Sequence, residues 1–187
     1  VIPNDFTFDV DGMIYVLTGP NRGGKSVITC AVGIAFVMAQ LGLPVCADEC
    51  VISPCDEIYT HFPTGSEDTI DKGRLGEECS RLGAIFETVT EDSLVLLDES
   101  LSSTGSYEGA YIASEVLQGF SMVGCRGIFS THLHDLAASV DEINAACLPK
   151  GGVKIDNLVA AIQEGSRSFK ILRAKPDGKS YARDIAE

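Results

Sequence analysis

The stretch that decides the fold is GPNRGGKS, formed by Gly19, Pro20, Asn21, Arg22, Gly23, Gly24, Lys25 and Ser26. It matches the pattern G-x-x-x-x-G-K-[ST], in which glycines let the backbone wrap around phosphate groups, the lysine reaches their oxygens and the serine ligates Mg²⁺. The pattern has this meaning only between a strand and a helix, and both are expected here, at about 13–17 and 25–41. We therefore predict a phosphate-binding loop, with an ordinary glycine turn as the alternative.

The composition is that of a folded, acidic domain. The chain has 187 residues, of which 45% are apolar and 22% charged, so it can form one full core, and we expect a single domain over residues 1–187. Its 27 acidic and 14 basic side chains leave a formal net charge of −13. Such a surface repels phosphate backbones and anionic lipid, so any contact with nucleic acid must be local or come from domains outside this chain.

Three features bear on the cellular compartment. Residues 26–47 carry no charge, but Gly33, Gly42 and Pro44 interrupt the run, which favours a helix buried in an α/β core over a membrane span. The seven cysteines form no C-x-x-C pair, so we expect reduced, structural thiols rather than disulfides or a metal cluster. The chain begins with Val1 and shows no signal peptide. We therefore expect a trimmed C-terminal fragment of a longer cytoplasmic protein, with no membrane partner.

The remaining segments alternate between strand and helix patterns. Residues 6–10 and 13–17 flank Asp11-Gly12, a strong hairpin signal, and predict an antiparallel N-terminal strand pair. Further strands are expected near residues 45 and 51 and at 58–62, 93–97, 127–130, 157–163 and 168–173; helices are expected at 75–89, 107–122 and near the C-terminus, and an exposed loop at 63–73. This alternation predicts an α/β fold with a mostly parallel central sheet flanked by helices.

A second motif follows the apolar run at 94–97, which closes on Asp98 and Glu99. A strand buried on both faces would deliver Asp98 beside a metal ion, and Glu99 could polarise an attacking water molecule. Acidic residues at a strand end are common by chance, but their combination with a glycine-rich phosphate loop favours these two roles.

Two histidines, His132 and His134, follow the strand expected at 127–130. At that place His132 could hydrogen-bond a γ-phosphate or the attacking water, whereas His134 suits a solvated or capping position. A zinc site would need further ligands, which the surrounding sequence does not offer. His61 has no partner that can be identified in the sequence.

Four segments in the right order resemble those of one family. TGPNRGGKS at 18–26 is similar to its TGPNMGGKS, SLVLLDES at 93–100 to its SLVLMDE, FSTHLHDL at 129–136 to its FATHxxEL, and GKSY at 178–181 to its K-S-Y-G segment. Over nearly its whole length, the chain thus resembles the ATPase domain of the MutS-type DNA mismatch-repair proteins, within the ABC class of P-loop ATPases.

The resemblance implies an enzyme that hydrolyses ATP to ADP and phosphate with Mg²⁺ and forms a homodimer around nucleotide. It would power DNA-directed work, either mismatch repair or a recombination-related task, by domains outside this chain. The resemblance assigns nucleotide contacts to the loop 19–26 and Val27, magnesium contacts to Ser26 and Asp98, and catalysis to Lys25, Glu99 and His132. Ile2 and Asn4 match the family's segment that lies against adenine.

Three departures indicate a divergent, MutS-related branch. The serine-threonine-phenylalanine signature that reaches the partner's nucleotide is absent where Gly73-Arg74-Leu75 aligns, residues 101–105 read LSSTG in place of GRGTS, and Val27 stands where a threonine is usual. Arg74, expected in a glycine-rich loop before the helix at 75–89, is the candidate to complete the partner's nucleotide pocket in trans, in the manner of an arginine finger. A surface arginine paired with Asp71 or Glu77 is the alternative.

Two other functions fit parts of the sequence. An ABC-type motor coupled to a transporter or a chromosome-structuring protein would share the phosphate loop, but no LSGGQ-like signature precedes Asp98. A nucleotide-dependent assembly module without hydrolysis would need no water-activating carboxylate, and Glu99 speaks against it. We therefore predict ATP hydrolysis as the local chemistry.

Overall fold

A six-stranded sheet forms the centre of the computed structural model, which describes residues 2–62, 71–101, 106–163 and 166–175. The strands are β1 (Ile14–Thr18), β2 (Ile58–His61), β3 (Leu94–Asp98), β4 (Arg126–Ser130), β5 (Ile155–Gln163) and β6 (Ser166–Arg173), in the spatial order β2-β3-β4-β1-β5-β6. Neighbouring strands are parallel except β5 and β6. The predicted α/β fold with a mostly parallel sheet is confirmed.

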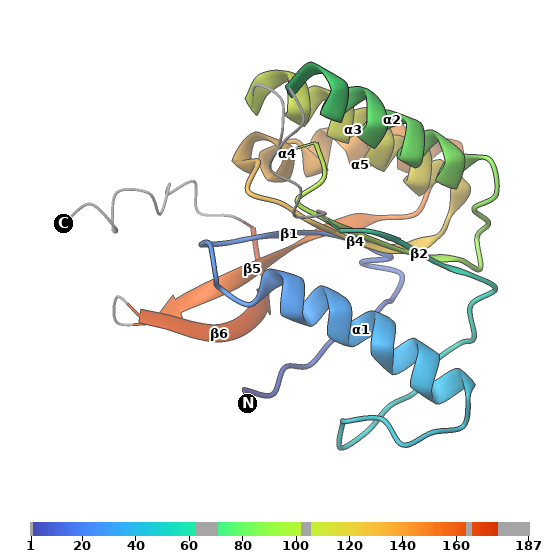
Figure 1. The fold of residues 1–187 in the computed structure, drawn as a ribbon, viewed down its shortest axis with the longest axis vertical. Helices are drawn as coiled ribbons and strands as arrows, with labels where there is room; N and C mark the ends of the chain where they lie inside the picture. Colours follow the sequence, from blue (N-terminus) through green and yellow to red (C-terminus); the bar gives the residue numbers. More distant parts are fainter. Residues whose placement is uncertain (1, 63–70, 102–105, 164–165, 176–187) are drawn as a thin grey trace.

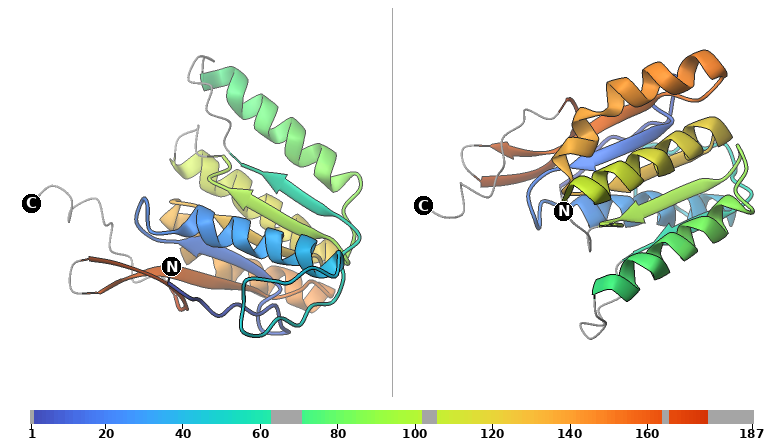
Figure 2. Two further views of the ribbon diagram at one scale, coloured as in Figure 1. Left: turned by 60° about the horizontal axis from the view of Figure 1, so that its bottom comes forward. Right: turned by 90° about the horizontal axis from the view of Figure 1, so that it is seen from above.

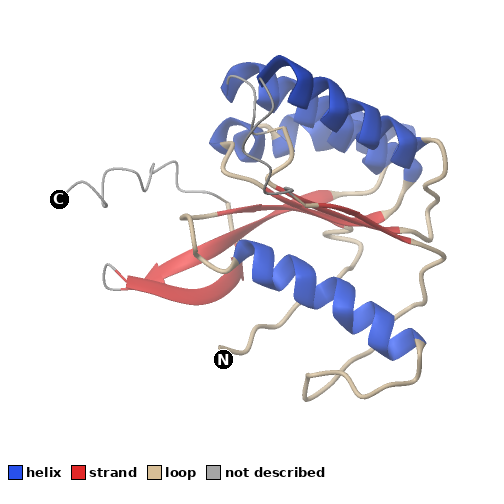
Figure 3. Ribbon diagram, viewed as in Figure 1, coloured by secondary structure: helices blue, strands red, loops and turns tan. Residues whose placement is uncertain are grey.

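Helices cover both faces of this sheet (Figure 1). Helix α1 (Lys25–Gln40) lies on one face, and the other face carries α2 (Asp71–Phe86), α3 (Ser106–Val123), α4 (His134–Ala138) and α5 (Val140–Cys147), followed by the short 3₁₀ helix η1 (Leu148–Lys150). Figure 3 shows the sheet between these two helical layers, and Figure 2 shows α2 toward the β2 edge and α5 toward β5. The helices predicted at 25–41, 75–89 and 107–122 are confirmed, whereas α4 and α5 were not predicted.

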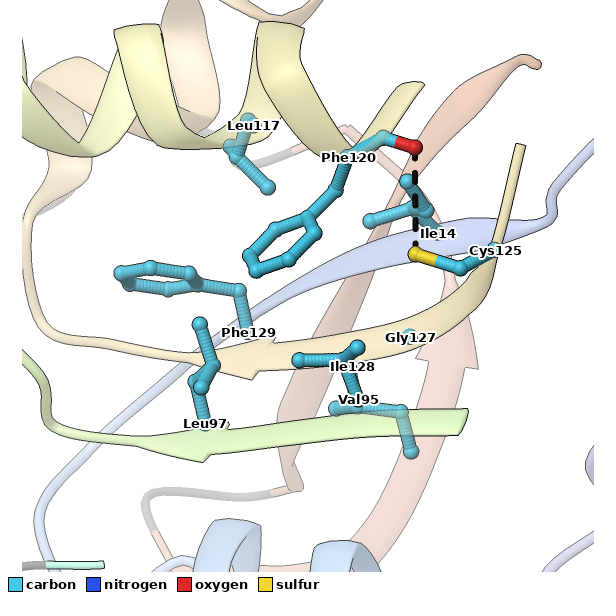
Figure 4. A pocket seen from close by; sticks show the side chains of 9 residues that line it. All are labelled: Ile14, Val95, Leu97, Leu117, Phe120, Cys125, Gly127, Ile128 and Phe129. Atoms are coloured by element: carbon cyan, nitrogen blue, oxygen red, sulfur yellow. Dashed lines mark hydrogen bonds between the residues drawn. The ribbon is translucent and has the colours of Figure 1, made fainter. Parts of the chain in front are cut away.

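The core lies between the sheet and α3. Every residue of β1, β3 and β4 is buried, as is expected of strands in a parallel sheet that is covered on both faces. Figure 4 shows Leu117 and Phe120 of α3 facing Phe129 across a small void. The thiol of Cys125 also lines this void, where it contacts the carbonyl oxygen of Phe120 at 3.8 Å, and burial raises its pKa to about 12. The lining offers little to a polar ligand, so this void is a packing feature of the core.

The uncharged run at 26–47 becomes helix α1 and the loop after it. Val32, Gly33 and Phe36 are buried against the sheet, and a Cβ on Gly33 would come within 2.6 Å of the Leu96 side chain. The opposite face of α1 is exposed, with Ile34 57% exposed, so the helix is buried along one face only. Among the described residues, none of the helices combines the length and the apolar character that crossing a bilayer requires.

The predicted antiparallel N-terminal strand pair is wrong. Residues 6–8 form no strand, and Asp9 and Gly12 only close a tight turn through two backbone hydrogen bonds of 3.0 Å. The reason is that β4 and β5 already occupy both edges of β1. The rings of Phe6 and Phe8 instead pack on Tyr15 of β1, with centroid distances of 5.3 and 6.0 Å.

Three further sequence expectations need correction or lie outside the described residues. The strands expected near residues 45 and 51 are absent, since residues 41–57 form an irregular connection. Of the loop expected at 63–73, residues 63–70 lie outside the described part, and 71–73 are the first residues of α2. The segments 102–105 and 176–187, which hold part of LSSTG, the GKSY motif and the expected final helix, also lie outside it.

Arg126, the first residue of β4, fastens the long connection after α1. Its guanidinium donates to the carbonyl oxygens of Ser53, Pro54 and Asp92 at 2.6, 3.0 and 2.8 Å. It also lies over the Phe36 ring, 5.2 Å from the centroid. Because the side chain is only 8% exposed, water cannot replace these contacts.

We expect Arg126→Met to lower the free energy of unfolding by about 3 kcal/mol, because hydrogen bonds to a charged group contribute about 1.5–3 kcal/mol each and are not fully additive. Urea denaturation measures the loss. Arg126→Lys is the matched control, since it keeps the charge without the planar fork and should recover only part of the stability. An Arg126→Met chain with an unchanged urea midpoint would show that the hydrogen bonds of Arg126 contribute nothing to the stability of the fold.

Candidate functional site

The glycine-rich loop 19–24 joins β1 to α1, as the sequence predicts. Gly19 and Gly24 have φ values of 144° and 93°, a region that L side chains rarely adopt. A Cβ on Gly19 would come within 2.6 Å of the Ala160 Cβ on β5, and one on Gly23 within 2.8 Å of the Pro20 carbonyl oxygen. The loop therefore needs glycine for its conformation and for its close approach to β5.

Lys25 places a positive charge inside this loop. Its side chain is only 4% exposed, and its Nζ donates to the carbonyl oxygens of Gly19 and Pro20 at 3.0 and 3.2 Å. Burial lowers the pKa of the ammonium, while the charges of Glu99 and Asp98 oppose that shift. The first turn of α1 holds no acidic residue that would offset the partial positive charge at the N-terminus of the helix. This partial charge and Lys25 would therefore both attract an anion bound in the loop.

The strand ends bring the separate motifs to one edge of the sheet. Ser130, the last residue of β4, is paired with Leu17 of β1 on one side and with Asp98 of β3 on the other. Because these strands are parallel, the glycine-rich loop, the Asp98-Glu99 pair and the turn before α4 all follow the same carboxyl edge, where α/β proteins bind their ligands. The structure thus brings together the three motifs that the sequence singled out.

Asp98 is buried with an oxygen that has no hydrogen-bond partner among the described residues. The side chain is 5% exposed, and the unpaired atom is Oδ1. The hydroxyl of neighbouring Ser130, which sequence analysis missed, is likewise buried without a described partner. An ionised carboxylate is costly to bury unless it is paired or coordinates a metal. The site therefore fits a hard cation such as Mg²⁺, with exposed Ser26 at the start of α1 as the second predicted ligand.

Glu99 directly follows Asp98, and His132 follows Ser130 by two residues, but the two side chains differ in exposure. Glu99 is half-buried, has a φ of 50° and donates its backbone N–H to the carbonyl oxygen of Ser130 at 2.8 Å. His132 is exposed just after β4, in a turn where Thr131 donates its N–H to the carbonyl oxygen of Leu17 at 2.9 Å. The turn that carries His132 is therefore fastened to the end of β1, directly before the loop.

The N-terminal segment docks on β6. Asn4 Nδ2 donates to the carbonyl oxygen of Phe169 at 3.0 Å, and its Oδ1 accepts from the N–H of Ile171 at 2.7 Å. Phe169 has a φ of 56°, is 46% exposed, and its Cδ1 lies 3.7 Å from the position of a Cβ on Gly24. Ile2, also 46% exposed, belongs to the same segment. Nothing in the sequence distinguished Phe169 from an ordinary strand residue.

The other predicted site residues lie at the surface of the loop or in α2. Asn21, Arg22 and Val27 are exposed, and Val27 is 73% exposed. Arg74 lies within α2 rather than in a loop before it, since that helix begins at Asp71. The side chain of Arg74 lies outside the described part of the structure, so the trans role remains a proposal.

Comparison with known proteins identifies the family. Residues 15–182 match the family model of MutS domain V. The chain is 39% identical over 145 residues to the DNA mismatch repair protein Msh6 of Gallus gallus, covering 72% of this chain and 11% of that protein. It is 36% identical over 191 residues to the DNA mismatch repair protein MutS of Methanothrix thermoacetophila, covering 99% of this chain and 21% of that protein. The chain spans about a fifth or less of the length of these curated relatives. It therefore belongs to the MutS family, in which it corresponds to domain V.

Proposed function

We propose that this domain binds ATP with Mg²⁺ and hydrolyses it to ADP and phosphate. One observation carries the proposal: β1 leads into a glycine-rich loop with a buried lysine, β3 ends in two carboxylates, and both strands pair with β4, so these groups share one edge of the sheet. Among the described residues, Oδ1 of the buried Asp98 has no hydrogen-bond partner. An ordinary glycine turn would need none of these neighbours. Phosphoryl transfer needs all of them, because it depends on positioning and on charge stabilisation.

The residues divide into holding and reacting roles. Lys25 and the N–H groups at the start of α1 hold the phosphates, and Ser26 and Asp98 hold Mg²⁺, which when bound neutralises charge on the phosphates. Glu99 orients and polarises the attacking water, and His132 hydrogen-bonds the γ-phosphate or that water. Ile2, Asn4 and Phe169 would lie against the base, with Phe169 next to Gly24 of the loop and Asn4 bonded to Phe169.

Phosphate release is the direct test. With ATP and Mg²⁺ the chain should show steady-state turnover that stops on chelation of the metal with EDTA and returns when excess Mg²⁺ is added. Nucleotide binding without turnover, in a chain shown to be dimeric, would favour an assembly module over an ATPase. Absence of nucleotide binding would contradict the proposal outright.

We further propose that two copies associate around nucleotide and that Arg74 acts across the interface. Arg74→Ala and Lys25→Ala should each abolish turnover alone. Mixed dimers of the two variants should regain about one working site, because one site then has both intact residues. Confirmed mixed dimers without phosphate release would leave Arg74 as a surface charge on α2.

DNA-directed work is proposed for regions outside this chain. With a net charge of −13 the isolated chain should bind duplex DNA weakly or not at all at physiological salt, because it has no broad surface from which to release counterions. A fluorescence-anisotropy titration measures this, with the salt concentration varied. Tight, salt-sensitive binding would place a basic DNA-binding surface on this domain.

A further inference from the structure

The turn that follows β3 is held in an unfavourable backbone conformation. Glu99 has a φ of 50° and Leu101 a φ of 64°, and neither is glycine. Left-handed conformations of this kind are unfavourable for residues other than glycine and persist only where the surrounding structure holds them, often at functional sites. The contacts that hold this turn therefore also hold Glu99.

Three contacts from three different elements fasten consecutive residues of the turn. The Ser130 carbonyl oxygen of β4 accepts from the N–H of Glu99 at 2.8 Å. His61, the last residue of β2, has its Nδ1 2.6 Å from the Ser100 hydroxyl oxygen. Glu78 of α2 accepts from the N–H of Leu101 at 2.8 Å through its Oε2.

The contact between His61 and Ser100 is shielded from water. His61 is 8% exposed and Ser100 2% exposed, so water cannot readily replace a lost hydrogen bond. His61 is itself fixed by the sheet, because it ends β2 in register with Leu97 of β3. The imidazole thus ties the residue directly after Glu99 to the edge strand.

We propose that His61, through its hydrogen bond to Ser100, is a positioning residue that holds Glu99 in the orientation needed to polarise water. The inference rests on the proposed ATPase function and adds a residue that lies outside the predicted site. His61 does not touch nucleotide in this role. It acts through Ser100 on the backbone of Glu99.

The role requires a hydrogen bond and not a charge. Burial lowers the pKa of His61 and the positive charge of Arg81 lowers it further, while Glu78 opposes the shift. The ring is therefore neutral at neutral pH. Asparagine, whose amide group can reach a position similar to that of Nδ1, should replace it, whereas leucine fills the space without a hydrogen bond.

The test compares four variants of the full chain in steady-state phosphate release and in titration with a fluorescent ATP analogue. His61→Leu and Ser100→Ala should each lower kcat about 10- to 100-fold, because small misplacements of a catalytic group have effects of this size. KM and analogue affinity should stay within about two-fold, since ground-state binding is unchanged. The double variant should be no slower than the slower single variant, and His61→Asn should recover most of kcat.

Tyr59→Phe is the matched control on the same strand. It also removes two side-chain hydrogen bonds, one to Thr88 Oγ1 at 2.9 Å and one to Glu57 just before β2 at 3.0 Å, but neither of them reaches the turn after β3. Its kcat should equal that of the wild type. Hydrogen exchange at residues 99–101 should increase in His61→Leu and in Ser100→Ala but not in Tyr59→Phe.

The outcomes separate this inference from the proposed function. Variants with full kcat and unchanged exchange at 99–101 would overturn the role of His61 alone. Parallel loss of kcat, analogue affinity and thermal stability would also overturn it, because His61 would then only stabilise the fold. If His61→Leu fails to fold, Ser100→Ala decides, since it removes the same hydrogen bond with a smaller change. A wild-type chain without turnover would contradict the proposed ATPase function, while the exchange result would still report whether His61 holds the turn.

Discussion

Glu99→Gln is expected to bind ATP with wild-type affinity and to hydrolyse it at least about 100-fold more slowly, since a positioned acid–base group contributes about 10²–10⁴-fold. The substitution keeps the size of the side chain and its ability to hydrogen-bond. It removes only the negative charge that would polarise the attacking water. Phosphate release measures the rate, and equilibrium titration with ATP measures the affinity.

Glu87→Gln is a suitable control for the loss of one negative charge, because Glu87 is exposed and follows the end of α2. Its turnover should match the wild type. A Glu99→Gln chain that keeps normal turnover would remove Glu99 from the catalytic role. It would then leave Glu99 as a residue whose backbone, bonded to Ser130, serves only the turn.

Lys25→Ala is expected to weaken ATP binding at least about 100-fold, since charge-assisted hydrogen bonds contribute about 1.5–3 kcal/mol each and the ammonium can reach two phosphates. In the structure this Nζ is already enclosed by the loop and bonded to the carbonyl oxygens of Gly19 and Pro20. Bound phosphate oxygens would offer it a more strongly charged acceptor. Isothermal titration with ATP and Mg²⁺ measures the loss.

Lys154→Ala is the control for the loss of one positive charge, because Lys154 pairs with Asp11 at 3.6 Å with both side chains well exposed. It should bind ATP like the wild type. Thermal melting of Lys25→Ala checks that the loop still folds without the two carbonyl contacts. Wild-type affinity in a folded Lys25→Ala chain would contradict a phosphate-binding role for the glycine-rich loop.

The elements that the sequence predicts well are those with a strong local pattern. The buried strands expected at 93–97 and 127–130 are β3 and β4, in which every residue is buried. The conformations at Gly19 and Gly24 follow the motif, since glycine, which has no Cβ, adopts a positive φ more readily than any other residue. The glycine-rich loop, the acidic strand end and the histidine turn are also local patterns, so their order along the chain predicted where the candidate site lies.

The elements that the sequence predicts poorly depend on which strand edges are still free for pairing. Residues 6–10 have strand propensity, but β1 had no free edge, so their aromatic side chains pack on Tyr15 instead. The antiparallel pair is formed by β5 and β6 at the other end of the chain. Strand propensity is a preference that the available partners can override.

The sequence by itself determined the alternation of buried strands and helices, the glycine-rich loop, and the acidic pair at the end of β3. These features arise from spacing and residue type within a few positions, where the physics is local. Only the tertiary structure decided that Asn4 pairs with β6, that Arg126 binds three carbonyl oxygens, and that His61 meets Ser100. Those contacts join residues 167, 73 and 39 positions apart, and the acceptors that Arg126 binds are all backbone carbonyls. Since every residue has a carbonyl, such partners leave no mark in the sequence, and burial alone makes the contact strong.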